Sequence, residues 1–114
     1  MTVWHEALAG DAWLVGVDGR LDQTQNRDLE NVLANLLDEG YIRFVVDLTE
    51  TTYINSGGLR TLVTAWRKAQ HHGGDLVLAG LSPKLQDVFS IVGFDQLFAI
   101  YATPEEAKKA ILPE

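Results

Sequence analysis

A serine that follows an asparagine and precedes two glycines is the feature of this sequence best suited to chemistry. The segment Asn55–Gly58 comes after an apolar run ending in Asp47 and a short polar turn, and it opens an amphipathic helical pattern. We therefore expect the Ser56 hydroxyl at a helix N-terminus, where free backbone N–H groups and the helix dipole favour negative charge. A serine there is suited to receive a phosphate. The alternative is that Asn55 or Ser56 only caps the helix.

A hydrolytic role for Ser56 is not supported, because no histidine is placed to act as its base. His5 stands at the start of the chain, while His71 and His72 come at the far end of the predicted helix. A helix of about 15 residues is roughly 22 Å long, so neither can reach Ser56 within one molecule. The segment also lacks the G-x-S-x-G pattern of a nucleophile elbow.

An acid at a strand end, Asp47, is the other candidate for phosphoryl chemistry. Such chemistry needs a metal-binding acidic cluster and a nearby lysine, and the sequence offers neither at the expected strand ends. We instead expect Asp47 to tether its loop by hydrogen bonds to backbone N–H groups. The chain has no cysteine and no G-x-x-x-x-G-K-[ST] phosphate loop. The sequence therefore predicts no enzyme, no metal site and no cofactor.

The composition limits the class of protein and of partner. With 114 residues, the chain is expected to form one domain over residues 1–114. Its formal charge of −7 argues against direct nucleic-acid binding and favours basic partner surfaces. No apolar run approaches the roughly 20 residues that cross a bilayer, so no membrane insertion is expected. The first residues lack the pattern of a signal peptide, which makes the cytoplasm the expected location.

The elements that must position Ser56 alternate between strands and helices. Leu59, Leu62, Val63 and Trp66 have helical spacing and are expected to face the core. The predicted order ββαβαβαβα indicates an α/β fold with a mostly parallel mixed sheet packed by about four helices. The predicted strands cover residues 2–7, 12–17, 42–48, 76–78 and 97–101, and the helices cover 28–37, 56–72, 83–92 and 103 onward.

Functional residues in such sheets tend to lie at the carboxyl ends of the strands. That edge is expected to carry Gly19–Asp22, Asp47, the turn Asn55–Gly58 and Gly80–Ser82. Only the turn around Ser56 combines a reactive hydroxyl with the start of a long helix. We therefore expect the functional surface of the domain there.

The sequence resembles the STAS domain of bacterial anti-sigma factor antagonists. The resemblance rests on the run Val45–Leu62, with Gly19–Asp22 upstream and Leu81–Pro83 downstream, and it extends over essentially the whole chain. Its most specific part is a strand, an acid, a loop and an Asx-Ser-x-Gly-Leu helix start. In that family the serine after the Asx residue is the regulatory phosphorylation site, and Ser56 matches it.

The resemblance implies a partner-switching role. In the family, the unmodified antagonist binds an anti-sigma factor that is also a serine kinase, and the sigma factor is released. Phosphorylation of the antagonist breaks that complex, and a serine phosphatase restores it. The expected partner-binding residues here are Asp22, Asn55, Ser56, Gly57, Gly58 and Arg60.

Three positions depart from the family pattern. The family commonly has Asp at the position of Asn55, Ser or Thr at that of Gly57, and Glu at that of Arg20. The loss of an acid beside Ser56 and the gain of Arg20 nearby make the surroundings of Ser56 less negative, which suits a phosphate or selects a different kinase. Arg60, one turn after Ser56, either pairs with that phosphate or is a solvated helix residue.

Two other functions stay open at this point. One is an unphosphorylated STAS scaffold, or a regulatory subunit of a transporter or a larger signalling assembly. The other is a small-ligand or nucleotide binder that uses the helix N-terminus at Ser56, although no dedicated motif supports it. A weak homo-oligomer is also left open.

Overall fold

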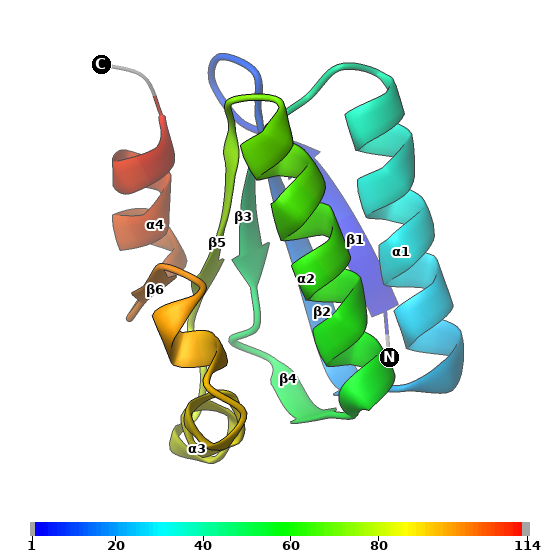
Figure 1. The fold of residues 1–114 in the computed structure, drawn as a ribbon, viewed down its shortest axis with the longest axis vertical. Coiled ribbons are helices and arrows are strands. Elements are labelled where there is room, and N and C mark those ends of the chain that lie inside the picture. Colours follow the sequence, from blue (N-terminus) through cyan, green and yellow to red (C-terminus); the bar gives the residue numbers. More distant parts are fainter. Residues whose placement is uncertain (1, 113–114) are drawn as a thin grey trace.

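The computed structural model describes residues 2–112, and in it helices pack on both faces of a mixed β-sheet (Figure 1). Strands β1, β2, β3, β5 and β6 lie side by side in that order, and β4 pairs with the far end of β2. The strands are β1 (Thr2–Ala7), β2 (Ala12–Leu21), β3 (Arg43–Asp47), β4 (Thr51–Ile54), β5 (Asp75–Ala79) and β6 (Ile100–Tyr101). The helices are α1 (Gln23–Asp38), α2 (Ser56–His71), α3 (Pro83–Ile91) and α4 (Pro104–Ile111), with a 3₁₀ turn, η1 (Phe94–Gln96).

The direction of the strands follows from the lengths of their connections. Strands β1 and β2 form an antiparallel hairpin whose connection contains Gly10 at φ 70°, a conformation that glycine adopts without strain. Each later connection that runs through a helix joins parallel strands, so Val46 of β3 lies between Val15 of β2 and Leu78 of β5. The predicted hairpin and the mostly parallel mixed sheet are confirmed.

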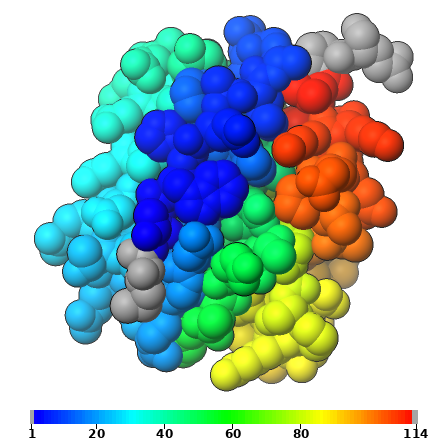
Figure 2. All heavy atoms as spheres, turned by 180° about the vertical axis from the view of Figure 1, so that it is seen from behind, coloured from blue at the N-terminus to red at the C-terminus, as the bar shows by residue number. Residues whose placement is uncertain are grey.

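Alternation along the central strands divides the core between two faces of the sheet. Phe44 and Val46 of β3 point to the larger cluster under α1, α2 and α3, whereas Val45 points to a smaller cluster under α4. Figure 1 shows α1 and α2 side by side across one face of the sheet. Seen from behind, residues of β1 form an open surface beside α4 (Figure 2). The start of α2, where the functional surface is expected, therefore packs on the larger cluster.

The predicted order of elements is wrong in one place, because it omits β4. The stretch Thr51–Ile54 is not a turn but a strand that runs parallel to the end of β2, beyond an irregularity at Gly19 and Arg20. Thr51 is buried, and its hydroxyl donates a hydrogen bond of 2.7 Å to the Val17 carbonyl oxygen. The same pairing extends β2 to Leu21, so β2 ends later and α1 begins earlier than predicted.

The inward face of α2 largely agrees with the predicted one. Leu59 and Leu62 are buried, while Val63 and Trp66 are half-buried at the margin of the same cluster. The Trp66 ring meets Phe98 edge to face, with centroids 6.0 Å apart. Within residues 2–112, no helix has the length and apolar character needed to cross a membrane.

Candidate phosphorylation and partner-binding site

The start of α2 leaves the Ser56 hydroxyl free. Asn55 has an extended backbone, and its Oδ1 accepts a hydrogen bond of 3.0 Å from the Gly58 N–H, which makes Asn55 the N-cap. Ser56 is the first residue of the helix and is exposed. The first turn contains no acidic residue. Asn55 thus caps the helix, and the neighbouring Ser56 carries a hydroxyl that is not used for capping.

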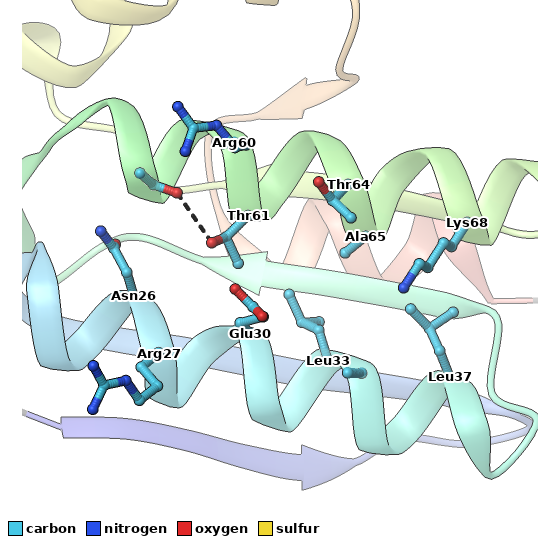
Figure 3. Close-up of a pocket in the computed structure, with 12 residues that line it drawn as sticks. Asn26, Arg27, Glu30, Leu33, Leu37, Arg60, Thr61, Thr64, Ala65 and Lys68 are labelled. Atoms are coloured by element: carbon cyan, nitrogen blue, oxygen red, sulfur yellow. Dashed lines mark hydrogen bonds between the residues drawn. The ribbon is translucent and has the colours of Figure 1, made fainter.

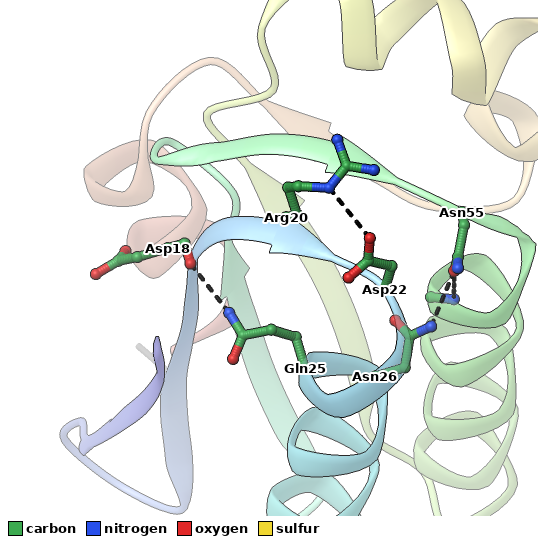
Figure 4. Close-up of polar contacts among 7 residues, drawn as sticks. Asp18, Arg20, Asp22, Gln25, Asn26 and Asn55 are labelled. Carbon is green, nitrogen blue, oxygen red and sulfur yellow. Dashed lines mark hydrogen bonds and ion pairs between the residues drawn. The ribbon is translucent and has the colours of Figure 1, made fainter. Parts of the chain in front are cut away.

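Asn26 of α1 forms a second contact with the same cap. Its Nδ2 donates a hydrogen bond of 2.8 Å to Asn55 Oδ1, so that one oxygen accepts from two donors (Figure 4). The other end of the carboxamide, Asn26 Oδ1, is buried and has no hydrogen-bond partner. Sequence analysis did not identify Asn26, because it lies 29 residues before Asn55 and before the predicted start of its helix.

The end of β2 forms the next part of this edge. Arg20 makes an ion pair of 3.1 Å with Asp22, and its guanidinium lies 4.0 Å from the centroid of the Tyr53 ring on β4. The Asn55 N–H donates to the carbonyl oxygen of Leu21, which brings the end of β2 to the start of α2. Arg20 therefore pairs with Asp22 and lies over Tyr53. Its guanidinium already has two partners within the domain.

A groove of about 500 Å³ lies between α1 and α2 (Figure 3), and Gly57 is one of the residues that line it. Its floor is apolar and includes Leu33 and Ala65. In Figure 3, Glu30 and Lys68 point into the groove, whereas Arg60 extends from α2 away from α1. The remaining lining residues are Asn26, Arg27, Ala34, Leu37, Thr61 and Thr64. Of the four charged residues that line the groove, Arg27, Arg60 and Lys68 are basic and Glu30 is acidic, so its lining is mainly positive.

Asp47 has the structural role expected from the sequence. Its Oδ1 accepts a hydrogen bond of 3.0 Å from the Thr49 N–H and another from the Thr49 hydroxyl. The prediction that Asp47 tethers its own loop is confirmed. Across residues 2–112, no group of three or more His, Cys, Asp or Glu side chains is arranged to hold a metal ion.

The expected partner-binding residues fall on two adjoining segments at one end of the sheet. Asp22 belongs to the link between β2 and α1, and the others belong to the first turn of α2 and its cap. Gly58 is buried, Asn55 and Gly57 are half-buried, and Ser56 and Arg60 are exposed. Ser56 is therefore an exposed hydroxyl residue close to the point where these two segments adjoin.

Comparisons with known proteins are consistent with this arrangement. Residues 9–107 match the family model described as STAS domain. BtrV of Bordetella bronchiseptica, named as a candidate anti-sigma factor antagonist, is 34% identical over 94 residues, which cover 82% of this chain and 81% of BtrV.

Solved structures share the fold at lower sequence identity. The anti-sigma factor antagonist SpoIIAA in its unphosphorylated form matches with a TM-score of 0.78 at 18% identity, covering 96% of this chain and 97% of that one. The Bacillus cell fate determinant SpoIIAA in its phosphorylated form matches with a TM-score of 0.80 at 18% identity, covering 97% and 100%.

Proposed function

This chain belongs to the STAS domain family of anti-sigma factor antagonists, and we propose that phosphorylation of Ser56 switches its binding to an anti-sigma factor. The observation that carries the proposal is the division of roles at the start of α2. Asn55 caps the helix, which leaves an exposed serine hydroxyl directly after the cap. Structures of SpoIIAA in its unphosphorylated and phosphorylated forms share this fold, which supports the proposal that such a domain can carry this modification.

The proposed switch works through charge and hydration at the surface, without a change of fold. A phosphoserine adds about −1.5 to −2 charges at a helix N-terminus, which the helix itself tolerates well. The same charge would stand at the centre of a surface that binds a neutral hydroxyl. Burying it without a matched cation costs several kcal/mol, which is a large part of the roughly 8 kcal/mol that holds a micromolar complex.

The partners that we propose are an anti-sigma factor with serine kinase activity and a serine phosphatase. The anti-sigma factor transfers the phosphate and then dissociates, while the phosphatase restores the binding form. In this role the domain is a substrate and a binding module, and it catalyses nothing itself. The proposed site of action is the cytoplasm, where a sigma factor and its regulator meet.

The direct test is to map the phosphate. The protein is incubated with ATP and the kinase-type anti-sigma factor encoded in the same genome, and modified peptides are located by mass spectrometry. We expect one phosphate on Ser56 and none on the Ser56→Ala variant. Phosphate on Thr49 or Thr52, with Ser56→Ala still fully modified, would contradict the proposal.

A scaffold without phosphorylation is the second candidate, and the departures at Asn55 and Gly57 are the observations that favour it. The family commonly carries other residues at these two positions. A scaffold needs no free hydroxyl, so it would bind its partner equally well with alanine or aspartate at position 56. Binding measurements on those two variants separate the candidates.

A further inference from the structure

We propose that Asn26 is the positioning residue of the Ser56 site. Its carboxamide orients the cap of α2, and it occupies the space that a side chain at position 57 would need. This inference rests on the function proposed above, because it concerns how Ser56 is presented for modification. It extends the site from the first turn of α2 to a residue of α1.

Asn26 acts on Ser56 through Asn55 and Gly58, the two residues that define the first turn. Asn55 Oδ1 holds the Gly58 N–H at 3.0 Å and is itself held by Asn26 Nδ2 at 2.8 Å. Ser56 lies in the chain between the acceptor and the donor of the cap. Fixing the Asn55 side chain from α1 therefore fixes the backbone from which the Ser56 hydroxyl projects.

The Asn26 carboxamide also accounts for the glycine at position 57. A Cβ atom on Gly57 would lie 2.7 Å from Asn26 Nδ2, whereas one on Gly58 would lie 2.9 Å from Asn26 Oδ1 and equally close to carbon atoms of two core side chains. A side chain at position 57 would therefore compete for space with the Nδ2 group that donates to Asn55. Gly57 is accordingly a partner of Asn26, which accounts for glycine where related sequences commonly have Ser or Thr.

Because one oxygen of Asn26 has no hydrogen-bond partner, replacing Asn26 should affect the positioning of Ser56 more than the stability of the fold. Turning the carboxamide over would place Asn26 Oδ1 against Asn55 Oδ1, so the donor contact fixes the orientation in which Oδ1 is buried without a partner. A buried acceptor without a partner destabilises a fold. Replacing Asn26 with alanine removes a favourable bond together with this unfavourable group, so the melting temperature should change little.

The test compares phosphorylation rates of matched variants. With ATP and the kinase-type anti-sigma factor from the same genome, we expect kcat for Asn26→Ala to fall roughly two- to tenfold, the range that one hydrogen bond supports, with KM nearly unchanged. Asn26→Asp keeps the shape but cannot donate, so it should be equally slow. Asn31→Ala, an exposed asparagine on the same helix, is the control and should match the wild type.

A double-mutant cycle tests the pairing of Asn26 with Gly57. Gly57→Ser should slow phosphorylation in the wild type but add little further loss when Asn26 is already alanine. Amide hydrogen exchange at Gly58, followed by NMR, should be faster in Asn26→Ala, and this readout needs no kinase. Additive losses in the cycle would overturn the pairing.

The failure of this inference can be told apart from the failure of the proposed function. If wild-type protein receives no phosphate on Ser56, the proposed function is wrong and positioning for phosphotransfer falls with it. If wild type and Asn26→Ala are phosphorylated equally fast, with equal protection at Gly58, the switch stands and the role of Asn26 is refuted.

Discussion

The starts of α2 and α3 lie at the same end of the molecule, and each contains a serine with a different role (Figure 1). At α3, Ser82 is the cap itself, since its Oγ accepts a hydrogen bond of 3.2 Å from the Leu85 N–H and Pro83 follows it. At α2, Asn55 takes that role, and Ser56 comes one residue later. Two similar serines thus differ by one position relative to the cap.

The difference teaches what makes a helix-start serine available for modification. A hydroxyl that caps a helix is occupied by the backbone, as Thr103 also shows by accepting from the Glu106 N–H at the start of α4. A hydroxyl directly after a separate cap has the same electrostatic environment but no such bond. Whether the residue before the serine caps the helix therefore decides whether the serine hydroxyl is free.

The largest expected effect tests whether the two helices are equally well anchored. Leu62 under α2 is 0% exposed and Leu85 under α3 is 1% exposed. We expect Leu62→Ala and Leu85→Ala each to lower the free energy of unfolding by about 2–5 kcal/mol, as cavity-forming changes do. Chemical denaturation measures both. An unchanged midpoint for either variant would mean that the helix concerned is not anchored as described.

The next effect tests partner binding at the two serines. Ser56→Asp should weaken binding to the anti-sigma factor at least tenfold, or by about 1.4 kcal/mol, with an unchanged melting temperature. The true phosphoserine should weaken it more, because aspartate has less charge and a shorter reach. Titration calorimetry measures the affinity.

Ser82→Asp is the matched control, since aspartate also caps a helix well. It adds the same charge at the same end of the molecule, and we expect it to leave the affinity unchanged. Ser56→Ala should bind within about 1.5 kcal/mol of wild type, because it loses at most one imperfect hydrogen bond. Equal affinities for wild type, Ser56→Ala and Ser56→Asp would favour the scaffold.

A smaller effect tests directly which of the two serine hydroxyls caps a helix and which is free. Ser82→Ala should cost about 0.5–2 kcal/mol of stability through loss of the α3 cap. Ser56→Ala should leave stability nearly unchanged, because the α2 cap is Asn55. Thermal unfolding of the two variants measures this difference. A loss at Ser56→Ala as large as that at Ser82→Ala would show that the Ser56 hydroxyl is not free.

The smallest effect concerns Arg60. It is exposed one turn after Ser56, and its side chain extends away from α1 (Figure 3). If it pairs with a phosphate on Ser56, Arg60→Ala should destabilise the phosphorylated protein by up to about 1 kcal/mol and leave the unmodified protein unaffected. Thermal unfolding of both forms measures this. Equal effects on the two forms would identify Arg60 as a solvated helix residue.

Local patterns explain why much of the fold and the start of α2 could be predicted. The helical spacing of Leu59 and Leu62 locates the buried face of α2, and the sequence Ser82-Pro83 marks the start of α3. The Asx-Ser-x-Gly-Leu segment likewise indicates the start of α2 without reference to the rest of the chain, while the structure identifies Asn55 as its cap. Each of these signals lies within one or two turns of the element that it predicts.

Strand β4 and Asn26 depend on contacts between distant segments, and both were missed. Thr51–Ile54 has the β-branched and aromatic residues typical of a strand, but it is as short as a turn. Its pairing with the end of β2, which identifies it as a strand, is not evident from the sequence. Asn26 acquires its role only because α1 and α2 pack side by side. A single polar residue near a helix start carries no sequence signal for a partner 29 positions away.

The hydrogen bond between Asn26 and Asn55 also makes the start of α2 depend on the docking of α1. Because the cap of α2 is completed by a residue of α1, a newly made segment around Ser56 is not presented correctly until the two helices have docked. A kinase that recognises the finished turn would therefore phosphorylate chains whose helices have not docked more slowly than the folded protein. The proposed switch would then act preferentially on molecules that have already folded and are able to bind a partner.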